Sequence, residues 1–362
     1  MESNISHIQQ AKELHLIMTD MKYAPLGWSG IKVSKVCLGG MSFGKASPDF
    51  HQWTIDQQGT EQVIGHAIDR GINFIDTANC YAFGTSEEYI GQALRNLNIA
   101  RHQVVLASKV YFNDGHLSKE AINREIDGTL KRLGTDYLDL YIIHRFDYTT
   151  PAEETMEALD ALVKAGKVRA LGASEMYAYQ FHNLQAVADA NGWTRFTSMQ
   201  CHYNLLYRED ERELIPVCQQ YDVALTPYSP MASGHLARPT WNSNSPAAPL
   251  TAPCTTSMTK RRRKTCPSSS ACMRCPSATE CPCSGRACMA LGQRRDRTDR
   301  GCSKPARVDD AIAALNVQLT EDDIAYIEEP YTAHELVGPL SRPGEKALAG
   351  TLATTLKETT RN

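Results

Sequence analysis

The sequence predicts a (β/α)8 TIM barrel, in which eight parallel strands alternate with helices. Seven apolar, strand-like segments recur at a spacing of about thirty residues, the usual length of one β–helix–β unit. Stretches with helical spacing of apolar residues lie between them. A doubly wound sheet would normally carry a glycine-rich phosphate loop after its first strand, and the sequence has none there. The barrel is therefore the better prediction.

The strand-like segments are short and end in polar loops. In chain order they are residues 35–38, 73–76, 104–109, 138–144, 168–173, 196–200 and 223–228. Helices are expected around Glu61 and Glu157, and an eighth strand between residues 235 and 300. Residues 308–315 again have helical spacing, and Thr320 is a suitable N-cap for a following helix because acidic residues come next.

The 362 residues suffice for one large barrel, and the hydrophobic content of 42% and charged content of 22% are typical of globular proteins. No run of about 18 apolar residues predicts a membrane span. Residues 1–20 lack the apolar core of a secretory signal. We expect a cytoplasmic protein with a polar extension at 1–20, a barrel at 21–340 and a tail at 341–362.

Four residues with complementary chemistry occur where predicted strands give way to loops. Asp76 ends one strand and Tyr81 follows five residues later, while Lys109 and His144 end the next two strands. Parallel barrels place their active sites at the carboxyl ends of the strands. An aspartate that caps a loop, or a histidine buried in the core, is the alternative for each residue alone. Their coincidence on three consecutive strand ends favours one site.

These residue types are suited to carbonyl reduction by hydride transfer, which requires a proton donor at the developing alkoxide. Tyrosine, with an ordinary pKa near about 10, is a weak acid unless a neighbouring ammonium stabilises its anion. We therefore expect Tyr81 to be the proton donor and Lys109 to lower its pKa. Asp76 would hold Lys109 in place, and His144 would orient the carbonyl oxygen.

Several short motifs occur in a recognisable order. They are LGGMSFG at 38–44, DTANCY at 76–81, SK at 108–109, DYLDLYIIH at 136–144, GAS at 172–174, QCHYN at 200–204 and PYSP at 227–230. With them, the chain from Met21 to about residue 240, and from Gly301 to about residue 338, resembles the aldo-keto reductases. The similarity is greatest to their bacterial branch of aldehyde and sugar-aldehyde reductases. The resemblance implies the same four catalytic residues and no metal.

The resemblance also implies a nicotinamide cofactor bound without a Rossmann domain. Tyr228 would stack on the nicotinamide ring, and Ser174 and Gln200 would hold its carboxamide. The family usually has Asn or Ser where this chain has Glu175, and an ionised carboxylate accepts hydrogen bonds but does not donate them. That contact is therefore open. The resemblance places these further residues along the cofactor: Gly40, Met41, Asp76, Ser229, Met231 and Ser233.

Residues 301–307 resemble the adenosine-phosphate clamp of the family. Ser303, Lys304 and Arg307 would lie near a 2′-phosphate, with Asp310 on the adenine side. Two cations and a hydroxyl favour NADP(H) over NAD(H). The alternative for Lys304 and Arg307 is a solvated helix start.

Residues 255–300 differ in composition from the rest of the chain. They hold 11 Lys and Arg against 3 Asp and Glu, six of the twelve cysteines, one Leu, and no Val, Ile or aromatic residue. Buried elements rarely have such a composition. The cysteines at 272, 275, 281 and 283 have roughly zinc-like spacing, and the basic run 260–264 permits nucleic-acid binding.

We interpret residues 244–300 as translated out of frame, with a zinc knuckle or a disordered insert as alternatives. Read one base later, the codons of Cys288-Met289-Ala290 force a Trp, and the family has Ala-Trp-Leu in its seventh barrel helix. On this interpretation the seventh helix and the eighth strand are disrupted, leaving open strand edges. We then expect a chain that is poorly soluble or weakly active.

The function we expect is NADP(H)-dependent reduction of a small aldehyde or ketone, with no nucleic-acid or membrane partner and an oligomeric state that stays open. The rivals are a nucleotide-binding regulatory subunit of the same fold and a catalytically impaired pseudoenzyme. Phe83, Phe112 and Phe146 lie near the catalytic strand ends, where they are candidates either for an apolar substrate pocket or for packing.

Overall fold

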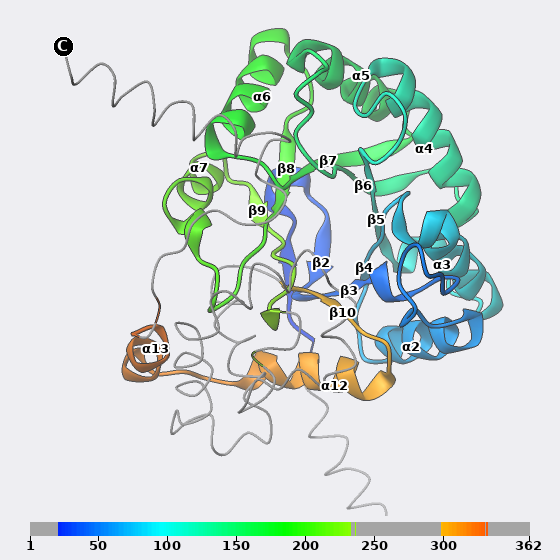
Figure 1. Ribbon diagram of the computed structural model, residues 1–362, viewed down its shortest axis with the longest axis vertical. Coiled ribbons are helices and arrows are strands. Elements are labelled where there is room, and N and C mark those ends of the chain that lie inside the picture. The colour runs from blue at the N-terminus through cyan, green and yellow to red at the C-terminus, as the bar shows by residue number, and fades with distance from the viewer. Residues whose placement is uncertain (1–20, 233–235, 237–297, 330, 332–362) are drawn as a thin grey trace, which may run out of the picture.

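The computed structural model describes residues 21–232, 236, 298–329 and 331 of the chain. Eight parallel strands curl into a barrel in the spatial order β10-β3-β4-β5-β6-β7-β8-β9, with helices on the outside (Figure 1). The strands are β3 (Val36–Gly39), β4 (Phe74–Asp76), β5 (Val105–Val110), β6 (Leu138–Ile143), β7 (Val168–Ser174), β8 (Phe196–Gln200), β9 (Ala224–Leu225) and β10 (Thr298–Gly301). The predicted (β/α)8 barrel is confirmed.

The seven strands predicted before residue 230 are all present, although β9 is shorter than predicted. It ends at Leu225, whereas the apolar segment runs to Tyr228. The chain nevertheless continues beside β8, because Thr226 N donates to Met199 O and Tyr228 N to Cys201 O, both at 2.9 Å. Tyr228 is therefore held at the carboxyl end of the barrel by backbone hydrogen bonds.

The eighth strand corrects one prediction. β10 pairs in parallel with β3, with Thr298 opposite Val36 and Gly301 opposite Gly39. We expected this strand to be disrupted because we interpreted its segment as out of frame, and for these four residues that was wrong. A parallel ladder is built from backbone N–H and C=O groups, which any non-proline residue supplies. The predicted seventh helix, the extension 1–20 and the tail 341–362 lie outside the described residues.

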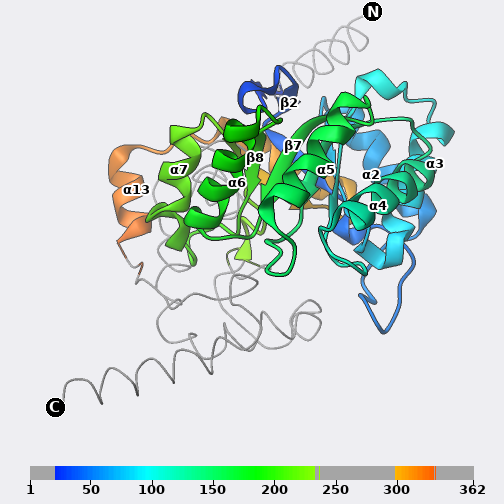
Figure 2. The same cartoon turned by 90° about the horizontal axis from the view of Figure 1, so that it is seen from above.

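Helices cover the outside of the barrel and follow one another around it (Figure 2). They are α2 (Gln57–Asp69), α3 (Thr85–Asn96), α4 (Lys119–Leu133), α5 (Ala152–Lys164), α6 (Ala178–Asn191), α7 (Leu214–Gln220), α12 (Pro305–Ala313) and α13 (Glu321–Glu328). The side chains of Asp56, Ser118 and Thr320 accept hydrogen bonds from backbone N–H groups in the first turns of α2, α4 and α13. The predicted Thr320 cap is thus confirmed.

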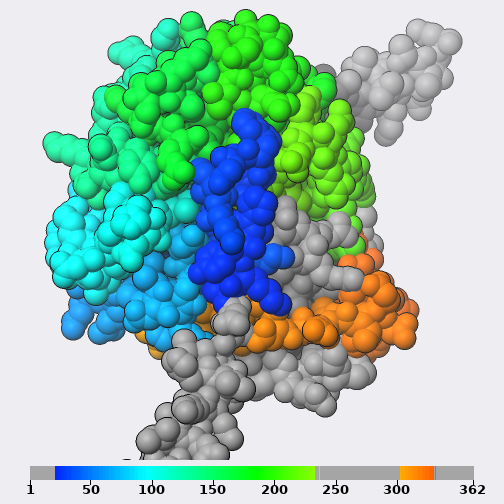
Figure 3. All heavy atoms as spheres, turned by 180° about the vertical axis from the view of Figure 1, so that it is seen from behind, coloured from blue at the N-terminus to red at the C-terminus, as the bar shows by residue number. Residues whose placement is uncertain are grey.

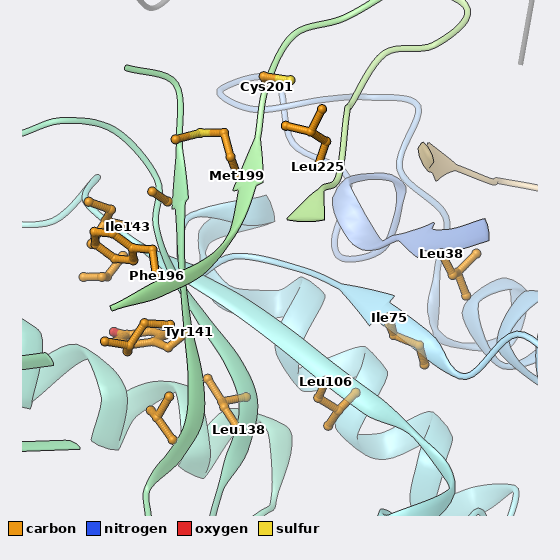
Figure 4. Packing of buried hydrophobic residues seen from close by; sticks show 14 of the residues in the cluster. Leu38, Ile75, Leu106, Leu138, Tyr141, Ile143, Phe196, Met199, Cys201 and Leu225 are labelled. Carbon is orange, nitrogen blue, oxygen red and sulfur yellow. The ribbon is translucent and has the colours of Figure 1, made fainter. Parts of the chain in front are cut away.

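The strand residues alternate between two apolar layers, as the two-residue period of a strand requires. One layer packs between the strands and the helices, and Figure 4 labels ten of its members, among them Leu38, Ile75, Leu106 and Tyr141. The intervening side chains fill the barrel interior. They include Cys37, Phe74, Val105, Ala107, Leu140, Ile142 and Ala170.

An antiparallel hairpin of β1 (Tyr23–Pro25) and β2 (Lys32–Ser34) closes the end of the barrel where the strands begin. Leu26, Ile31 and Val33 are buried against the interior residues of the barrel. Figure 3 shows the hairpin, in blue, across the middle of one face of the molecule. Asp76, Lys109 and His144 lie at the opposite end of the barrel, where the strands finish.

The last described helices return to the first part of the barrel. His66 Nε2 on α2 and Arg70 Nε at the C-cap of α2 each lie 3.0 Å from the carboxylate of Asp309 on α12. The helix after β10 is therefore fixed beside the helix after β3. Within the described part of the chain, none of the helices combines the length and the apolar character that a membrane crossing requires.

Candidate active site

Three polar residues lie at the ends of their strands, at positions whose side chains point into the barrel. Asp76 and Lys109 lie on β4 and β5, and His144 directly follows β6. The interior residues two positions earlier are Phe74, Ala107 and Ile142. Because side chains of a strand alternate in direction, the polar residues point to the same interior at the carboxyl ends of the strands. Tyr81 reaches this place from the loop after β4.

Lys109 is the centre of the group. Its Nζ is hydrogen-bonded to Asp76 Oδ1 and donates to Thr77 O at 2.8 Å and to the Tyr81 hydroxyl at 3.3 Å. Lys109 and Asp76 are 0% and 1% exposed. A buried ammonium is tolerated only where such partners compensate its lost hydration. The charge of Lys109 is therefore held beside the Tyr81 oxygen.

His144 completes the group. Its ring packs edge-on against Tyr81 and Phe112, with centroids 5.8 and 5.0 Å apart. Cys80 Sγ lies 3.9 Å from His144 Nδ1. Burial, followed by the charges of Lys109 and Arg145, holds the pKa of His144 well below its ordinary value. His144 is therefore a neutral ring at neutral pH, and the four residues predicted from the strand ends lie together.

Gln200 connects this group to the ends of β7 and β8. Its Nε2 donates to Asp76 Oδ2 at 3.2 Å, and its backbone carbonyl oxygen accepts from Ser174 Oγ at 2.8 Å. Gln200, Ser174 and Asp76 are all buried. Ser174 and Gln200, which are predicted to contact a nicotinamide carboxamide, are thus connected by hydrogen bonds to the group formed by Asp76, Tyr81, Lys109 and His144.

Tyr228 lies in an aromatic stack that the sequence did not reveal. The His202 ring is stacked between Tyr207 and Tyr228, with centroid distances of 4.8 and 5.1 Å and interplanar angles of 18° and 20°. Burial lowers the pKa of His202 to about 4, so the ring is neutral. The only sequence signal for His202 was its place inside the QCHYN motif. The stack fixes the plane of the half-buried Tyr228 ring.

Glu175 lies beside Tyr228, and the two side chains are hydrogen-bonded. It is 8% exposed and has a left-handed backbone, with φ of +52°. Burial raises the pKa of Glu175 to about 8, and the hydrogen bond from Tyr228 opposes this effect. Glu175 stands where the family usually has Asn or Ser. It therefore puts a buried carboxyl group next to the predicted nicotinamide site.

The turns after β3 and β9 hold several of the residues predicted to lie along the cofactor. A Cβ atom on Gly40 would come within 2.9 Å of Asp76 O, so the close approach of this turn requires glycine. Met41 and Met231 are half-buried, and so is Ser229, whose φ is +55°. Ser233 lies outside the described residues.

The start of α12 gathers a hydroxyl group and two cations. Pro305 occupies its first turn, and Lys304 is its N-cap residue. Arg307 Nη1 donates to Ser303 Oγ at 3.0 Å, while Lys304 and Arg307 are exposed. Asp310 lies one turn farther along the helix and is half-buried. Backbone N–H groups at a helix start, joined by cations, have the chemistry that binds phosphate.

Two of the three candidate phenylalanines are exposed near the ends of the catalytic strands. Phe112 is 44% exposed and lies edge-on to the His144 ring, and Phe83 is 69% exposed two residues after Tyr81. Phe146 instead packs against the main apolar core. Of the three phenylalanines, Phe83 and Phe112 are exposed and Phe146 has a packing role. Among the described side chains, no cluster of three His, Cys, Asp or Glu residues could hold a metal ion, and the cysteines at 272–283 lie outside them.

The chain matches the Aldo/keto reductase family over residues 35–267. It is 38% identical over 353 residues to versiconal hemiacetal acetate reductase of Aspergillus parasiticus, covering 90% of this chain and 100% of that protein. A putative aryl-alcohol dehydrogenase of Schizosaccharomyces pombe is 37% identical over 350 residues, covering 88% and 98%. A crystallised thermostable aldo-keto reductase, in complex with the inhibitor epalrestat, is similar with a TM-score of 0.67 and 25% identity, covering 86% and 100%.

Fold and site together define an oxidoreductase built on a (β/α)8 barrel. The chain belongs to the aldo/keto reductase family, whose members act on small carbonyl compounds and generally use NAD(P)H. The expected bacterial branch is not supported, because these curated relatives are fungal. Nor is the frame-shift interpretation supported: the fungal alignments cover about nine-tenths of the chain, and the family match continues to residue 267.

Proposed function

We propose that this protein reduces aldehydes or ketones to alcohols with NADP(H) as cofactor and Tyr81 as proton donor. The observation that carries the proposal is the buried Lys109 ammonium 3.3 Å from the Tyr81 hydroxyl. An ammonium at that distance stabilises the tyrosinate left after proton transfer. Asp76 holds Lys109 in this position, because its carboxylate balances the buried charge. The bound cofactor would supply the hydride to the carbonyl carbon.

The neutral ring of His144 has a separate role in the proposal. A neutral imidazole can donate one hydrogen bond to the carbonyl oxygen without adding a second charge beside Lys109. Its packing against Tyr81 and Phe112 holds the ring in one orientation. His144 would thus position the oxygen that Tyr81 protonates.

The residues around the site fit NADP(H). Tyr228 offers a ring face held by the His202 stack, and Ser174 and Gln200 offer polar groups beside it. Ser229, Met231 and Ser233 would line the pyrophosphate path, and Gly40 and Met41 would bind elsewhere on the cofactor. The hydroxyl and cations of Ser303, Lys304 and Arg307 suit a 2′-phosphate, which NAD(H) lacks, and Asp310 would lie on the adenine side.

An aromatic carbonyl compound is the substrate class that the site favours. Exposed Phe112 and Phe83 offer ring faces and edges near His144 and Tyr81. Aromatic rings attract one another in edge-to-face and offset arrangements. The names of fungal relatives, which include putative aryl-alcohol dehydrogenases, support the same class.

A catalytically impaired protein, or a nucleotide-binding regulatory subunit of the same fold, is the alternative. The unusual composition of residues 244–300 is the feature that favours it. A cytoplasmic location also stays a prediction.

Two measurements test the proposal. Titration of the full chain with NADPH and NADH, followed by nicotinamide fluorescence, should show tighter binding of NADPH. The rate of NADPH oxidation should then be higher with benzaldehyde than with an aliphatic aldehyde of similar size. Absence of cofactor binding would sink the reductase proposal, and binding without turnover of any carbonyl compound would support the regulatory alternative.

A further inference from the structure

Glu175 is joined to the predicted nicotinamide site by its backbone and by its side chain. Its N–H donates to Gln200 O at 3.3 Å, the same oxygen that accepts from Ser174 Oγ. Its carboxyl group is hydrogen-bonded with Tyr228. A left-handed backbone is uncommon for a residue other than glycine, so the surrounding contacts must hold Glu175 in place. The buried carboxyl group of Glu175 is thus held on the same segment that contacts Gln200 and lies against Tyr228.

A second buried carboxyl group lies nearby. Asp210 is 8% exposed, and burial raises its pKa to about 7. Among the described residues, the charged and titratable groups that act on Glu175 are Tyr228, Asp210 and Arg145, together with the backbone of His202. After burial, the Asp210 charge also raises the pKa of Glu175, while Tyr228, Arg145 and His202 lower it, which leaves it at about 8. Glu175 therefore changes charge close to physiological pH.

The two forms of a nicotinamide cofactor differ at the ring by one positive charge. The oxidised ring is cationic and the reduced ring is neutral. Charges in a partly buried site attract one another more strongly than in water. We propose that Glu175 sets the preference of this site between the two forms: the ionised carboxylate favours NADP⁺ and the neutral acid favours NADPH. The inference rests on the proposed function, which puts the nicotinamide on Tyr228.

The direction of the pH dependence follows from the pKa of about 8. Below this pH Glu175 is mostly neutral, and above it the carboxylate attracts the oxidised ring. The ratio Kd(NADP⁺)/Kd(NADPH) should therefore fall between pH 6.5 and pH 9.5, by roughly tenfold for charges several ångströms apart at a protein surface. The ratio is the useful quantity because both cofactors carry the 2′-phosphate, whose own titration near about pH 6 cancels.

The main experiment measures both dissociation constants by titration of the full chain across this pH range. Glu175→Gln keeps the size of the side chain and removes its ionisation. Glu120→Gln, at an exposed position in the first turn of α4, is the matched control. The ratio should fall in the wild type and in Glu120→Gln and stay flat in Glu175→Gln. A flat ratio in the wild type, or an equal fall in Glu175→Gln, would overturn the inference.

A second measurement needs no variant. An oxidised ring that stabilises the Glu175 carboxylate lowers its pKa, so binding of NADP⁺ at pH 7.5 should release protons. In weak buffer with a pH indicator, saturating NADP⁺ should release up to about one proton per site more than NADPH does. Equal proton counts would contradict the inference. If neither cofactor binds at any pH, the proposed function fails and the inference with it. If both bind with a flat ratio, only the role of Glu175 is lost.

Discussion

Single residues decide the proposed chemistry because the buried Lys109 ammonium contacts both Asp76 and Tyr81. Its described hydrogen bonds go to Asp76, to the Thr77 carbonyl and to the Tyr81 hydroxyl. Asp76 compensates the positive charge of Lys109, and this charge would stabilise the Tyr81 anion after proton transfer. The role of Tyr81 as proton donor can therefore be tested by removing its hydroxyl oxygen, which lies beside the Lys109 ammonium.

Tyr81→Phe removes the proposed proton donor and keeps the ring that packs on His144. The kcat for carbonyl reduction should fall by about 10² to 10⁴, which is the usual contribution of a positioned acid. The Kd for NADPH should change little. Tyr326→Phe, at a 39% exposed position on α13, is the control and should retain full activity. Turnover by Tyr81→Phe close to the wild-type rate would remove Tyr81 from the mechanism.

His144 should remain neutral through the physiological range. Burial and two nearby cations lower its pKa well below the ordinary value of about 6.5, so the unfolded chain binds a proton at His144 before the folded chain does. The resulting contribution to stability is present above about pH 6.5 and is lost as the pH falls. The His144 NMR signal, assigned with His144→Gln, should not shift between pH 8 and pH 6. A midpoint near 6.5, as in the denatured chain, would contradict this.

At the scale of elements, neighbouring helices pack at different distances around the barrel. In α3, a Cβ atom on Gly91 would lie 2.2 Å from the Leu133 carbonyl oxygen at the end of α4. In α2, a Cβ atom on Gly65 would meet only the Leu97 side chain, at 3.5 Å. The two glycines are chemically identical, but only one is required by the approach of another backbone.

This pair gives a matched prediction. Gly91→Ala should lower the free energy of unfolding by about 1–3 kcal/mol, because overpacking must push α3 from α4. Gly65→Ala should leave it unchanged or raise it by up to about 1 kcal/mol, since alanine favours a helix interior. Urea denaturation of both variants checks the difference. Equal effects would show that helix propensity, and not the contact of α3 with α4, governs both positions.

At the scale of the whole molecule, the sequence predicted the part of the fold that repeats. Seven apolar strands and the four polar residues at their ends could be found because each strand has its own pattern. The position of β10 within the expected interval 235–300 could not be predicted, because Thr298–Gly301 has no apolar pattern although its backbone pairs with β3. The contact of Lys109 with Thr77 O, and the stacking of His202 on Tyr228, depend on residues distant in the chain or on backbone atoms.

The hairpin that closes the barrel should matter for global stability. Leu26 is fully buried among interior residues from several strands, so Leu26→Ala should cost about 2–5 kcal/mol of unfolding free energy. Leu97→Ala, at a 38% exposed position, should cost much less. Chemical denaturation of the two variants provides the comparison. A loss below about 1 kcal/mol for Leu26→Ala would mean that the hairpin is dispensable for barrel stability.

The pairing of β10 with β3 joins the last barrel strand to be synthesised with the first. Between Leu225, at the end of β9, and Thr298, at the start of β10, the ribosome adds 73 residues. At 5–20 residues per second this takes roughly 4 to 15 seconds. During that interval the edge of β3 lacks the partner that β10 later supplies, and such an open edge is a site for aggregation and for chaperone binding. The rate of translation through residues 226–297 therefore sets how long the edge of β3 stays open in each new molecule.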